Sequence, residues 1–188
     1  MAVDTILFGD CRNTLKTLEE KPRMCVTSPP YYGLRDYGGE ESQIGQEQTP
    51  EEYIQSLVEV FRSVRDVLAD DGTLWVNIGD SYYNYRPGKG QSYPKQSVSK
   101  TKQDLPEQCN KRGNKLEGLK EKDLIGIPWM LAFALRSDGW YLRQDIIWHK
   151  PNPMPESVRD RCTKSHEYIF LFSKNRKYYY DNEAIKEP

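Results

Sequence analysis

A helix set between two short β-rich runs constrains the fold of this 188-residue chain more than any other feature. Residues 24–28 are expected to form one strand and residues 73–78 another. Between them, Thr49 and Pro50 begin a helix with a threonine N-cap, a proline at its first position and acidic residues in its first turn. Two strands joined through such a helix lie parallel. The pattern therefore predicts an α/β fold with a doubly wound, mostly parallel sheet.

The remaining elements are predicted from apolar spacing and from turn residues. They are a strand at residues 5–8, a helix at 12–18, a helix from 123 to about 137, and two strands at 140–148 and 167–173. Residues 151–155, which connect the last two strands, are rich in proline and therefore too stiff and too poor in donors to join a strand ladder. We therefore expect a C-terminal β-hairpin with a long proline-rich connection.

A long polar insertion interrupts this pattern. From residue 81 to residue 123 the apolar signal is lost, and Lys and Arg outnumber Asp and Glu. We expect a mobile basic loop inserted in the domain at 81–123, in which residues such as Arg86 and Lys89 contact phosphate while tyrosines stack on bases. A solvated insertion without a role remains the alternative.

A polar-Pro-Pro-aromatic corner follows the strand predicted at residues 24–28. Pro29 and Pro30 have no backbone donor, so strand hydrogen bonding must stop there, which leaves the preceding carbonyls without partners. Ser28 adds a hydroxyl acceptor beside them, and Tyr31 offers a flat face for stacking. In such sheets ligands bind beyond the carboxyl ends of the strands. The corner therefore suits a planar amine such as the exocyclic amino group of a nucleobase.

Three runs of the sequence resemble segments of one enzyme family, in the order in which the family has them. They are residues 27–37, which begin Thr-Ser-Pro-Pro-Tyr, residues 148–157 and residues 165–170. The family is the circularly permuted, beta-type group of S-adenosylmethionine-dependent DNA amino-methyltransferases, which methylate cytosine N4 or adenine N6. The resemblance covers nearly the whole chain and implies a Rossmann-like methyltransferase fold. The alternative is a proline turn in an unrelated α/β protein.

The resemblance implies direct methyl transfer to a base that is flipped out of the duplex. Its catalytic motif corresponds to Ser28, Pro29, Pro30 and Tyr31. The Ser28 hydroxyl and a backbone carbonyl near Pro29 would each accept one N–H of the target amine and so localise its lone pair, with Tyr31 as the stacking floor. Cytosine N4 is favoured over adenine N6, because family members with serine at this position more often modify cytosine.

The resemblance also implies contacts with the cofactor and with DNA. The residues expected at S-adenosylmethionine are Asp10, Cys11 and Thr27. Asp10 would accept from the adenine amino group, although a plain helix N-cap is the alternative for this residue. The residues expected at the target base or the DNA are Tyr32, Arg35, Trp148, Lys150 and Asn152, together with Arg86 and Lys89 of the basic loop. A core position is the alternative for Trp148.

One segment that the family carries has no match in the sequence. It is a Gly-rich cofactor segment, Asp-Pro-Phe-x-Gly-x-Gly, which follows a target-recognition region. We therefore expect residues 1–188 to form a partial methyltransferase catalytic domain. Its partners would be double-stranded DNA and either a second polypeptide or a further C-terminal segment that completes the sheet. A truncated chain or a relic is the alternative, and the chain alone is expected to have weak or no activity.

Composition argues against several other classes of protein. Four cysteines without a C-x-x-C pair and two isolated histidines, His149 and His166, argue against a zinc site and a disulfide framework, so we expect no metal and free thiols. The sequence has neither a leader nor a long apolar run, which predicts a cytoplasmic protein without a membrane partner. Two other functions stay open: a nonenzymatic module that binds DNA or a partner, and a methyltransferase that acts on a protein amide.

Overall fold

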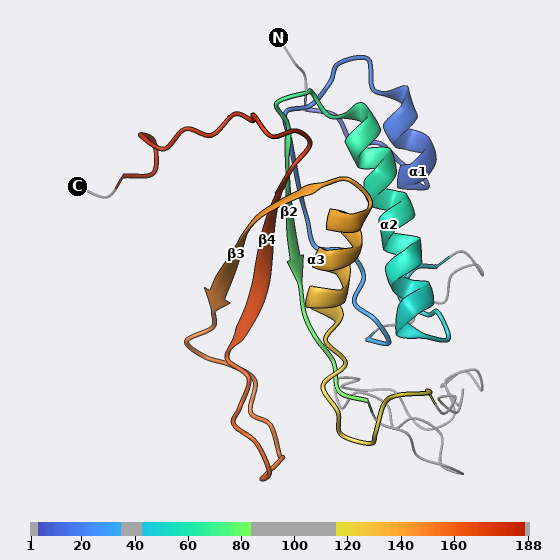
Figure 1. Cartoon of the computed structure of the whole chain (residues 1–188), viewed down its shortest axis with the longest axis vertical. Coiled ribbons are helices and arrows are strands. Elements are labelled where there is room, and N and C mark those ends of the chain that lie inside the picture. Colours follow the sequence, from blue (N-terminus) through green and yellow to red (C-terminus); the bar gives the residue numbers. More distant parts are fainter. Residues whose placement is uncertain (1–3, 35–42, 84–115, 187–188) are drawn as a thin grey trace. The chain divides into compact units, whose positions relative to one another are not determined.

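The computed structural model describes residues 4–34, 43–83 and 116–186 (Figure 1). The chain divides into two compact units, one of Met1–Asp80 with Gly126–Pro188 and one of Ser81–Ile125. Every named helix and strand that the structure describes belongs to the first unit.

The predicted strand-helix-strand unit is confirmed. It consists of β1 (Met24–Thr27), α2 (Pro50–Val67) and β2 (Thr73–Ile78), and the two strands pair in parallel. Thr49 caps α2 as expected, because its side chain accepts from the Glu52 amide at 3.2 Å while the Glu52 carboxylate accepts from the Thr49 amide at 3.2 Å. This capping box satisfies two donors at the start of the helix and fixes where α2 begins.

The predicted C-terminal hairpin is also confirmed. β3 (Tyr141–His149) pairs antiparallel with β4 (His166–Ser173), and β4 pairs antiparallel with β2. The sheet order is therefore β1-β2-β4-β3. For the described residues the prediction of a mostly parallel sheet is wrong, since β1 and β2 make its one parallel pairing. The reason is that the second edge of β2 is taken by the returning hairpin strand and not by another crossover strand.

The helices lie on one side of this mixed sheet. Figure 1 shows α1 (Cys11–Thr14), α2 and α3 (Ile127–Ser137) on that side. Apolar side chains that alternate along β2 and β4 are fully buried with them: Leu74, Val76, Ile78, Phe170 and Phe172. Among the described residues no helix covers the other face, so a doubly wound arrangement stays a prediction.

The predicted strand at residues 5–8 is wrong. These residues pair with no strand in the described part of the chain, and Ile6 and Phe8 are 78% and 88% exposed. A β-rich run needs a neighbouring strand to receive its backbone hydrogen bonds, and no strand of the described ranges lies beside this one. The helix predicted at 12–18 is present in shorter form, as α1 followed by a 3-10 turn at Leu15–Thr17.

The start of α3 is anchored by Asp80, which lies two residues after the end of β2. Asp80 Oδ1 accepts from the backbone amides of Gly126 and Ile127, each at 3.0 Å. The helix then places the Trp129 ring edge-on to the rings of Tyr168, at 5.6 Å, and of Phe170, at 5.2 Å. These contacts join α3 to β4, one of the two strands at the centre of the sheet.

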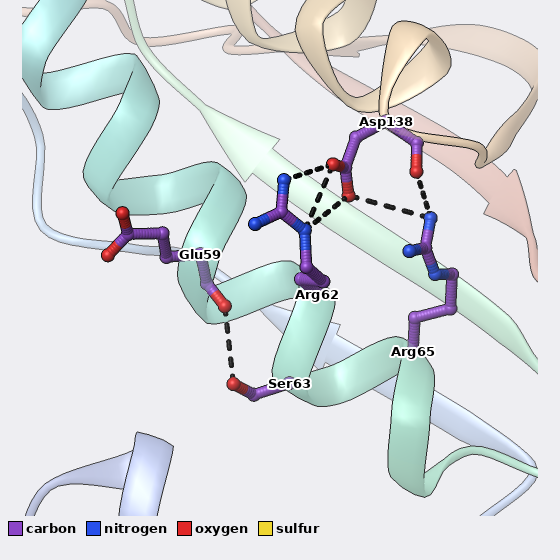
Figure 2. A network of polar contacts seen from close by, with 5 residues as sticks. All are labelled: Glu59, Arg62, Ser63, Arg65 and Asp138. Atoms are coloured by element: carbon purple, nitrogen blue, oxygen red, sulfur yellow. Dashed lines mark hydrogen bonds and ion pairs between the residues drawn. The ribbon is translucent and has the colours of Figure 1, made fainter.

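Figure 2 shows how α2 is fixed to the other end of α3. Asp138, the C-cap residue of α3, accepts from Arg62 Nε at 3.0 Å, and Arg65 Nη1 donates to its backbone carbonyl. Arg65 Nη1 also lies 3.5 Å from Asp138 Oδ2. Within α2, Ser63 Oγ donates to the Glu59 carbonyl at 3.2 Å. Two arginines one turn apart on α2 therefore hold a single residue of α3.

The second unit is described only at its two ends. Tyr82 and Leu124 form an isolated antiparallel bridge, the Tyr83 amide donates to the Asp123 carbonyl at 2.8 Å, and the Leu116 amide donates to Tyr83 Oη at 2.9 Å. The ends of the predicted loop thus pair with each other. Its remainder, with Arg86 and Lys89, lies outside the described residues, as does Cys109.

Two further features concern the described part of the chain as a whole. None of its helices combines the length and the apolar character that crossing a membrane requires. Its cysteines, Cys11, Cys25 and Cys162, are free thiols.

Candidate active site

The Pro-Pro corner begins directly after β1 ends at Thr27. Ser28 is exposed and Pro29 is buried, so the corner presents the serine side chain while its first proline packs inward. The Pro30 carbonyl accepts from Tyr53 Oη of α2 at 2.7 Å. Burial raises the pKa of Tyr53, which keeps its hydroxyl protonated as the donor of this bond. α2 therefore fixes the corner and occupies one of the carbonyls near Pro29.

A second loop closes over the corner. The Gly33 amide donates to the Gly45 carbonyl at 2.8 Å, and Gly45 adopts a φ of 101°. A Cβ on Gly45 would lie 3.1 Å from the Tyr31 carbonyl, so a glycine suits both the conformation and the close approach. Tyr32 is held nearby: its ring lies 5.4 Å from that of Tyr53, and its hydroxyl donates to the Gln48 carbonyl at 3.3 Å.

Tyr31 is the centre of a polar network at the carboxyl end of β2. Ser28 Oγ donates to Tyr31 Oη at 3.4 Å, and Tyr31 Oη lies within donating distance of Asn77 Oδ1, at 3.1 Å, and of Glu167 Oε2, at 3.3 Å. Burial raises the pKa of Tyr31, and the Glu167 carboxylate adds to the rise, although the Ser28 hydrogen bond opposes it. The tyrosine hydroxyl therefore remains protonated at neutral pH.

The Tyr31 ring lies where it does because residue 79 is a glycine. A Cβ on Gly79, the residue after β2, would lie 2.7 Å from Tyr31 Cε2, closer than real Cβ contacts allow. The ring thus packs directly on the backbone of Gly79, and no larger residue can stand there without moving it.

The predicted residues of the hairpin lie near this network. Trp148 is 55% exposed, so the alternative that it belongs to the core is wrong. It pairs with Glu167 across β3 and β4. Lys150 forms an ion pair with Glu167, and its amide donates to the Ser165 carbonyl at 2.7 Å. Asn152 is exposed in the proline-rich connection.

The predicted cofactor residues stand near the start of α1 and at the end of β1. Asp10 takes the role that was the alternative for it: it caps α1 by accepting from the Arg12 amide at 2.9 Å, and it forms an ion pair with the Arg12 side chain at 2.6 Å. The Arg12 hydrogen bonds lower the pKa of Asp10. Cys11 is exposed and Thr27 is half-buried. A contact of these three with a cofactor stays a prediction.

S-adenosylmethionine would meet only part of a binding site among these residues. Both carboxylate oxygens of Asp10 already accept from Arg12, at 3.0 Å to Nε in each case, so Asp10 could accept from a cofactor only through its remaining lone pairs. An acceptor such as Asp10 suits the amino group of a nucleoside, and beside it the Arg12 side chain is already engaged in the ion pair.

The structure thus brings together four predicted residues, Ser28, Tyr31, Trp148 and Lys150, through partners that the sequence analysis did not select. Those partners are Asn77, Gly79 and Glu167, and Tyr53, which was not selected either, binds the adjoining Pro30 carbonyl. Glu167 lies in the run 165–170 that supported the resemblance, which was the one available signal. Tyr53 gave no such signal, because it lies among the buried residues of α2 and resembles a core position. The predicted site residue Arg35 lies outside the described residues, like Arg86 and Lys89.

The two histidines stand opposite each other in the strand pairing, where β3 and β4 meet the proline-rich connection. His149 ends β3, His166 begins β4, and the two are paired. The His166 ring packs edge-on against Tyr168 at 5.3 Å, a structural contact. Within the described ranges no three His, Cys, Asp or Glu side chains gather as a metal ion would require, and the expectation of no metal stays a prediction.

Comparison with protein families matches residues 23–188 to the model of a family described as DNA methylase. Two curated relatives are type II methyltransferases: M.SmaI of Serratia marcescens is 55% identical over 97% of this chain, and M.Cfr9I of Citrobacter freundii is 51% identical over 97%. The chain spans only 60% and 58% of the length of these relatives.

Solved structures share the fold. PvuII DNA methyltransferase, described as cytosine-N4-specific, superposes with a TM-score of 0.61 at 16% identity, covering 94% of this chain and 51% of that one. The protein TTHA0409 of Thermus thermophilus, described as a putative DNA modification methylase and solved in complex with S-adenosyl-L-methionine, gives a TM-score of 0.57 at 20% identity and covers 94% of this chain and 55% of that one.

Proposed function

Because this chain belongs to the DNA methylase family, we propose that it is the catalytic part of an S-adenosylmethionine-dependent DNA amino-methyltransferase. The family membership agrees with the resemblance found in the sequence motifs. The identity of 50% or more to type II methyltransferases over nearly the whole chain supports a role in restriction-modification, and with it a cytoplasmic location beside DNA.

The observation that carries this proposal is the exposed Ser28 hydroxyl on a rigid corner. An exocyclic amine is a poor nucleophile, because its lone pair is delocalised into the ring of the base. Ser28 Oγ and a carbonyl near Pro29 accept its two N–H groups and draw the nitrogen toward tetrahedral geometry. The Pro30 carbonyl is engaged by Tyr53, which favours the Pro29 carbonyl as the second acceptor. S-adenosylmethionine supplies the electrophilic methyl group when it is bound beside this corner.

The proposed substrate is a base flipped out of double-stranded DNA, with cytosine N4 favoured over adenine N6. The preference rests on the serine at position 28. We expect the exposed Trp148 and Asn152 of the hairpin to contact the target nucleotide or the DNA backbone, and Tyr31 and Tyr32 to border the base. The predicted contacts of Arg35, Arg86 and Lys89 belong to the same proposal.

A further segment is proposed to complete the enzyme and to give it a complete Rossmann-like, doubly wound fold. β1 pairs only with β2 in the described part of the chain, and Met24 and Val26 of β1 are 58% and 70% exposed. An apolar strand with a free edge is a surface that proteins normally cover. The relatives are longer than the matched region, which supports a segment or second polypeptide that adds strands at β1 and brings the rest of the cofactor pocket.

The proposal is tested by methylation with the further segment supplied. The chain, joined to or mixed with the segment that its relatives carry outside the matched region, is assayed on DNA, and the modified nucleoside is identified by mass spectrometry. We expect N4-methylcytosine, and N6-methyladenine alone would overturn the preference for cytosine.

The Ser28→Ala variant separates catalysis from binding. It should lower the methylation rate on the order of a hundredfold or more while DNA binding, followed by electrophoretic mobility shift, stays within about twofold of the parent. Equal methylation by the variant and the parent would refute the assigned role of Ser28. DNA binding without any methylation by the completed parent would favour a nonenzymatic binding module instead.

A further inference from the structure

The hydrogen bonds around Tyr31 have a direction that can be worked out by counting protons. A tyrosine hydroxyl has one proton to give and can accept from others. Asn77 Nδ2 donates to the Tyr168 carbonyl at 3.2 Å, and a carbonyl can only accept, so the amide of Asn77 is oriented with its Oδ1 toward Tyr31. Glu167 Oε2, the second neighbour, is a carboxylate oxygen and accepts as well.

Tyr31 therefore gives its proton to one of these two acceptors. Its oxygen can then only accept from Ser28 Oγ, 3.4 Å away. The single proton of the Ser28 hydroxyl is thereby directed inward, and the lone pairs of the same oxygen are left facing outward. A hydroxyl in this state is an acceptor for an N–H donor, which is what a target amine presents.

We propose that Glu167, held by Lys150, is a positioning residue that orients the Tyr31 hydroxyl and thereby makes Ser28 a hydrogen-bond acceptor toward the amine. The inference rests on the proposed function and deepens it. It gives Lys150 a different role from the DNA contact expected for it, since its ammonium group is engaged with Glu167. The Glu167 side chain is 21% exposed, and the Lys150 ammonium group is its partner in an ion pair.

The geometry of the backbone supports this assignment. Lys150 and Glu167 come from the two sides of the hairpin, and the Lys150 amide bonds to the Ser165 carbonyl at 2.7 Å, which fixes the distance between their backbones. The absence of a side chain at Gly79 lets the Tyr31 ring pack against the end of β2, where its hydroxyl meets Asn77 and Glu167. A rigid element on each side of the network is what precise orientation of a reacting group requires.

The first test measures the titration of Tyr31 in the 188-residue chain and needs no catalysis. A fluorinated tyrosine is placed at position 31, where the fluorine substituents lower the phenol's own pKa and bring the titration into a milder pH range, and its state is followed by fluorine NMR. Glu167→Gln removes a negative charge and should lower the pKa of residue 31. Lys150→Met leaves that charge uncompensated and should raise it, whereas Lys150→Arg should restore the parent value.

The matched control is Glu183→Gln, which neutralises an exposed carboxylate that is also paired with a lysine, Lys186. It should leave the titration of residue 31 unchanged. The inference would be overturned if Glu167→Gln left the pKa of residue 31 unchanged, as this control should. It would also be overturned if Glu167→Gln and Lys150→Met shifted that pKa in the same direction. Thermal unfolding of each variant confirms that the comparison is made between folded proteins.

The second test uses methylation kinetics of the completed enzyme. In Glu167→Gln an amide N–H competes with Ser28 as donor to Tyr31, so kcat should fall roughly tenfold to a hundredfold while KM for DNA changes about twofold at most. A raised KM with an unchanged kcat would assign Lys150 and Glu167 to DNA binding and refute the positioning role. Absence of methylation by the completed parent would count against the proposed function, whereas the titrations would still decide the orientation of Tyr31.

Discussion

The absence of a side chain at residue 79 decides where the Tyr31 ring can lie. A Cβ at this position would stand 2.7 Å from Tyr31 Cε2, so Gly79→Ala must displace the ring and pull its hydroxyl from Asn77 and Glu167. We expect Gly79→Ala to cost about 1–3 kcal/mol of unfolding free energy, the range for inserting a methyl group into a packed site, and to slow methylation by the completed enzyme.

A double-mutant cycle with Tyr31→Ala provides the control for Gly79→Ala. Once the ring is absent, the added methyl group no longer meets the Tyr31 atoms that stand nearest to it, so the two costs measured by urea denaturation should be far from additive. Strict additivity would mean that the ring does not rest on Gly79.

At the same scale, the sequence predicted the residues whose chemistry is local. Ser28 and Tyr31 stand three positions apart in one run, and two prolines dictate the turn that exposes them. Glu167 lies 136 positions from Tyr31, and the two meet only because β4 returns beside β2 with one particular register. A single sequence does not contain that register, so the partners of Tyr31 could be found only in the structure.

Among the elements, α2 connects the helix layer to the corner through Tyr53. Removing its hydroxyl in Tyr53→Phe leaves the Pro30 carbonyl without a donor, and we expect a loss of about 1 kcal/mol of unfolding free energy at neutral pH. The pKa of Tyr53 is higher in the folded protein than its ordinary value, so its stabilisation is complete below about pH 10 and is lost as the pH rises beyond that.

Urea denaturation of the parent and of Tyr53→Phe, at neutral pH and above about pH 10, measures both effects. The difference in stability between the two proteins should shrink at the higher pH, because only the parent must hold a buried phenol protonated there. A difference that is constant with pH would contradict the buried, hydrogen-bonded state of Tyr53.

The contact of α2 with α3 depends on two arginines that differ in burial. Arg65 is 23% exposed and donates to the Asp138 carbonyl, while Arg62 is 47% exposed. We expect Arg65→Met, which keeps the apolar stem, to lower the unfolding free energy by about 1–2 kcal/mol. Arg62→Met is the matched control and should cost less, because solvent screens its ion pair. If urea denaturation showed the same loss of unfolding free energy for both variants, burial would not explain the difference expected between the two arginines.

The elements that the sequence predicted correctly are those specified within one turn or one strand. Thr49, Pro50 and Glu52 define the start of α2 without reference to any other part of the chain. The run at residues 5–8 has equally good strand composition, yet it forms no strand, because a strand depends on a neighbour that the described chain does not place beside it. The mixed order of the sheet escaped prediction for the same reason.

On the scale of the whole molecule, the two edges of the sheet are not equivalent. β3 forms one edge, and its residues are mostly exposed along its length. β1 forms the other edge, is only four residues long and exposes Met24 and Val26. If the longer relatives complete the fold through β1, then a charge on β1 should prevent completion without harming the chain itself.

Val26→Lys makes this expectation testable. Val26 is 70% exposed in the chain, so a lysine there meets water and should leave the thermal unfolding of the chain unchanged. In the completed protein the same lysine would be buried against an added strand, and a buried unpaired charge is costly. We expect the affinity for a separately supplied segment, measured by titration calorimetry, to fall at least about tenfold, which corresponds to about 1.4 kcal/mol.

The matched control is Tyr141→Lys, on the opposite edge strand and 44% exposed, which should bind the segment as the parent does. Equal loss of affinity in both variants would point to a general effect of added charge, and no loss in Val26→Lys would place the further segment somewhere other than β1.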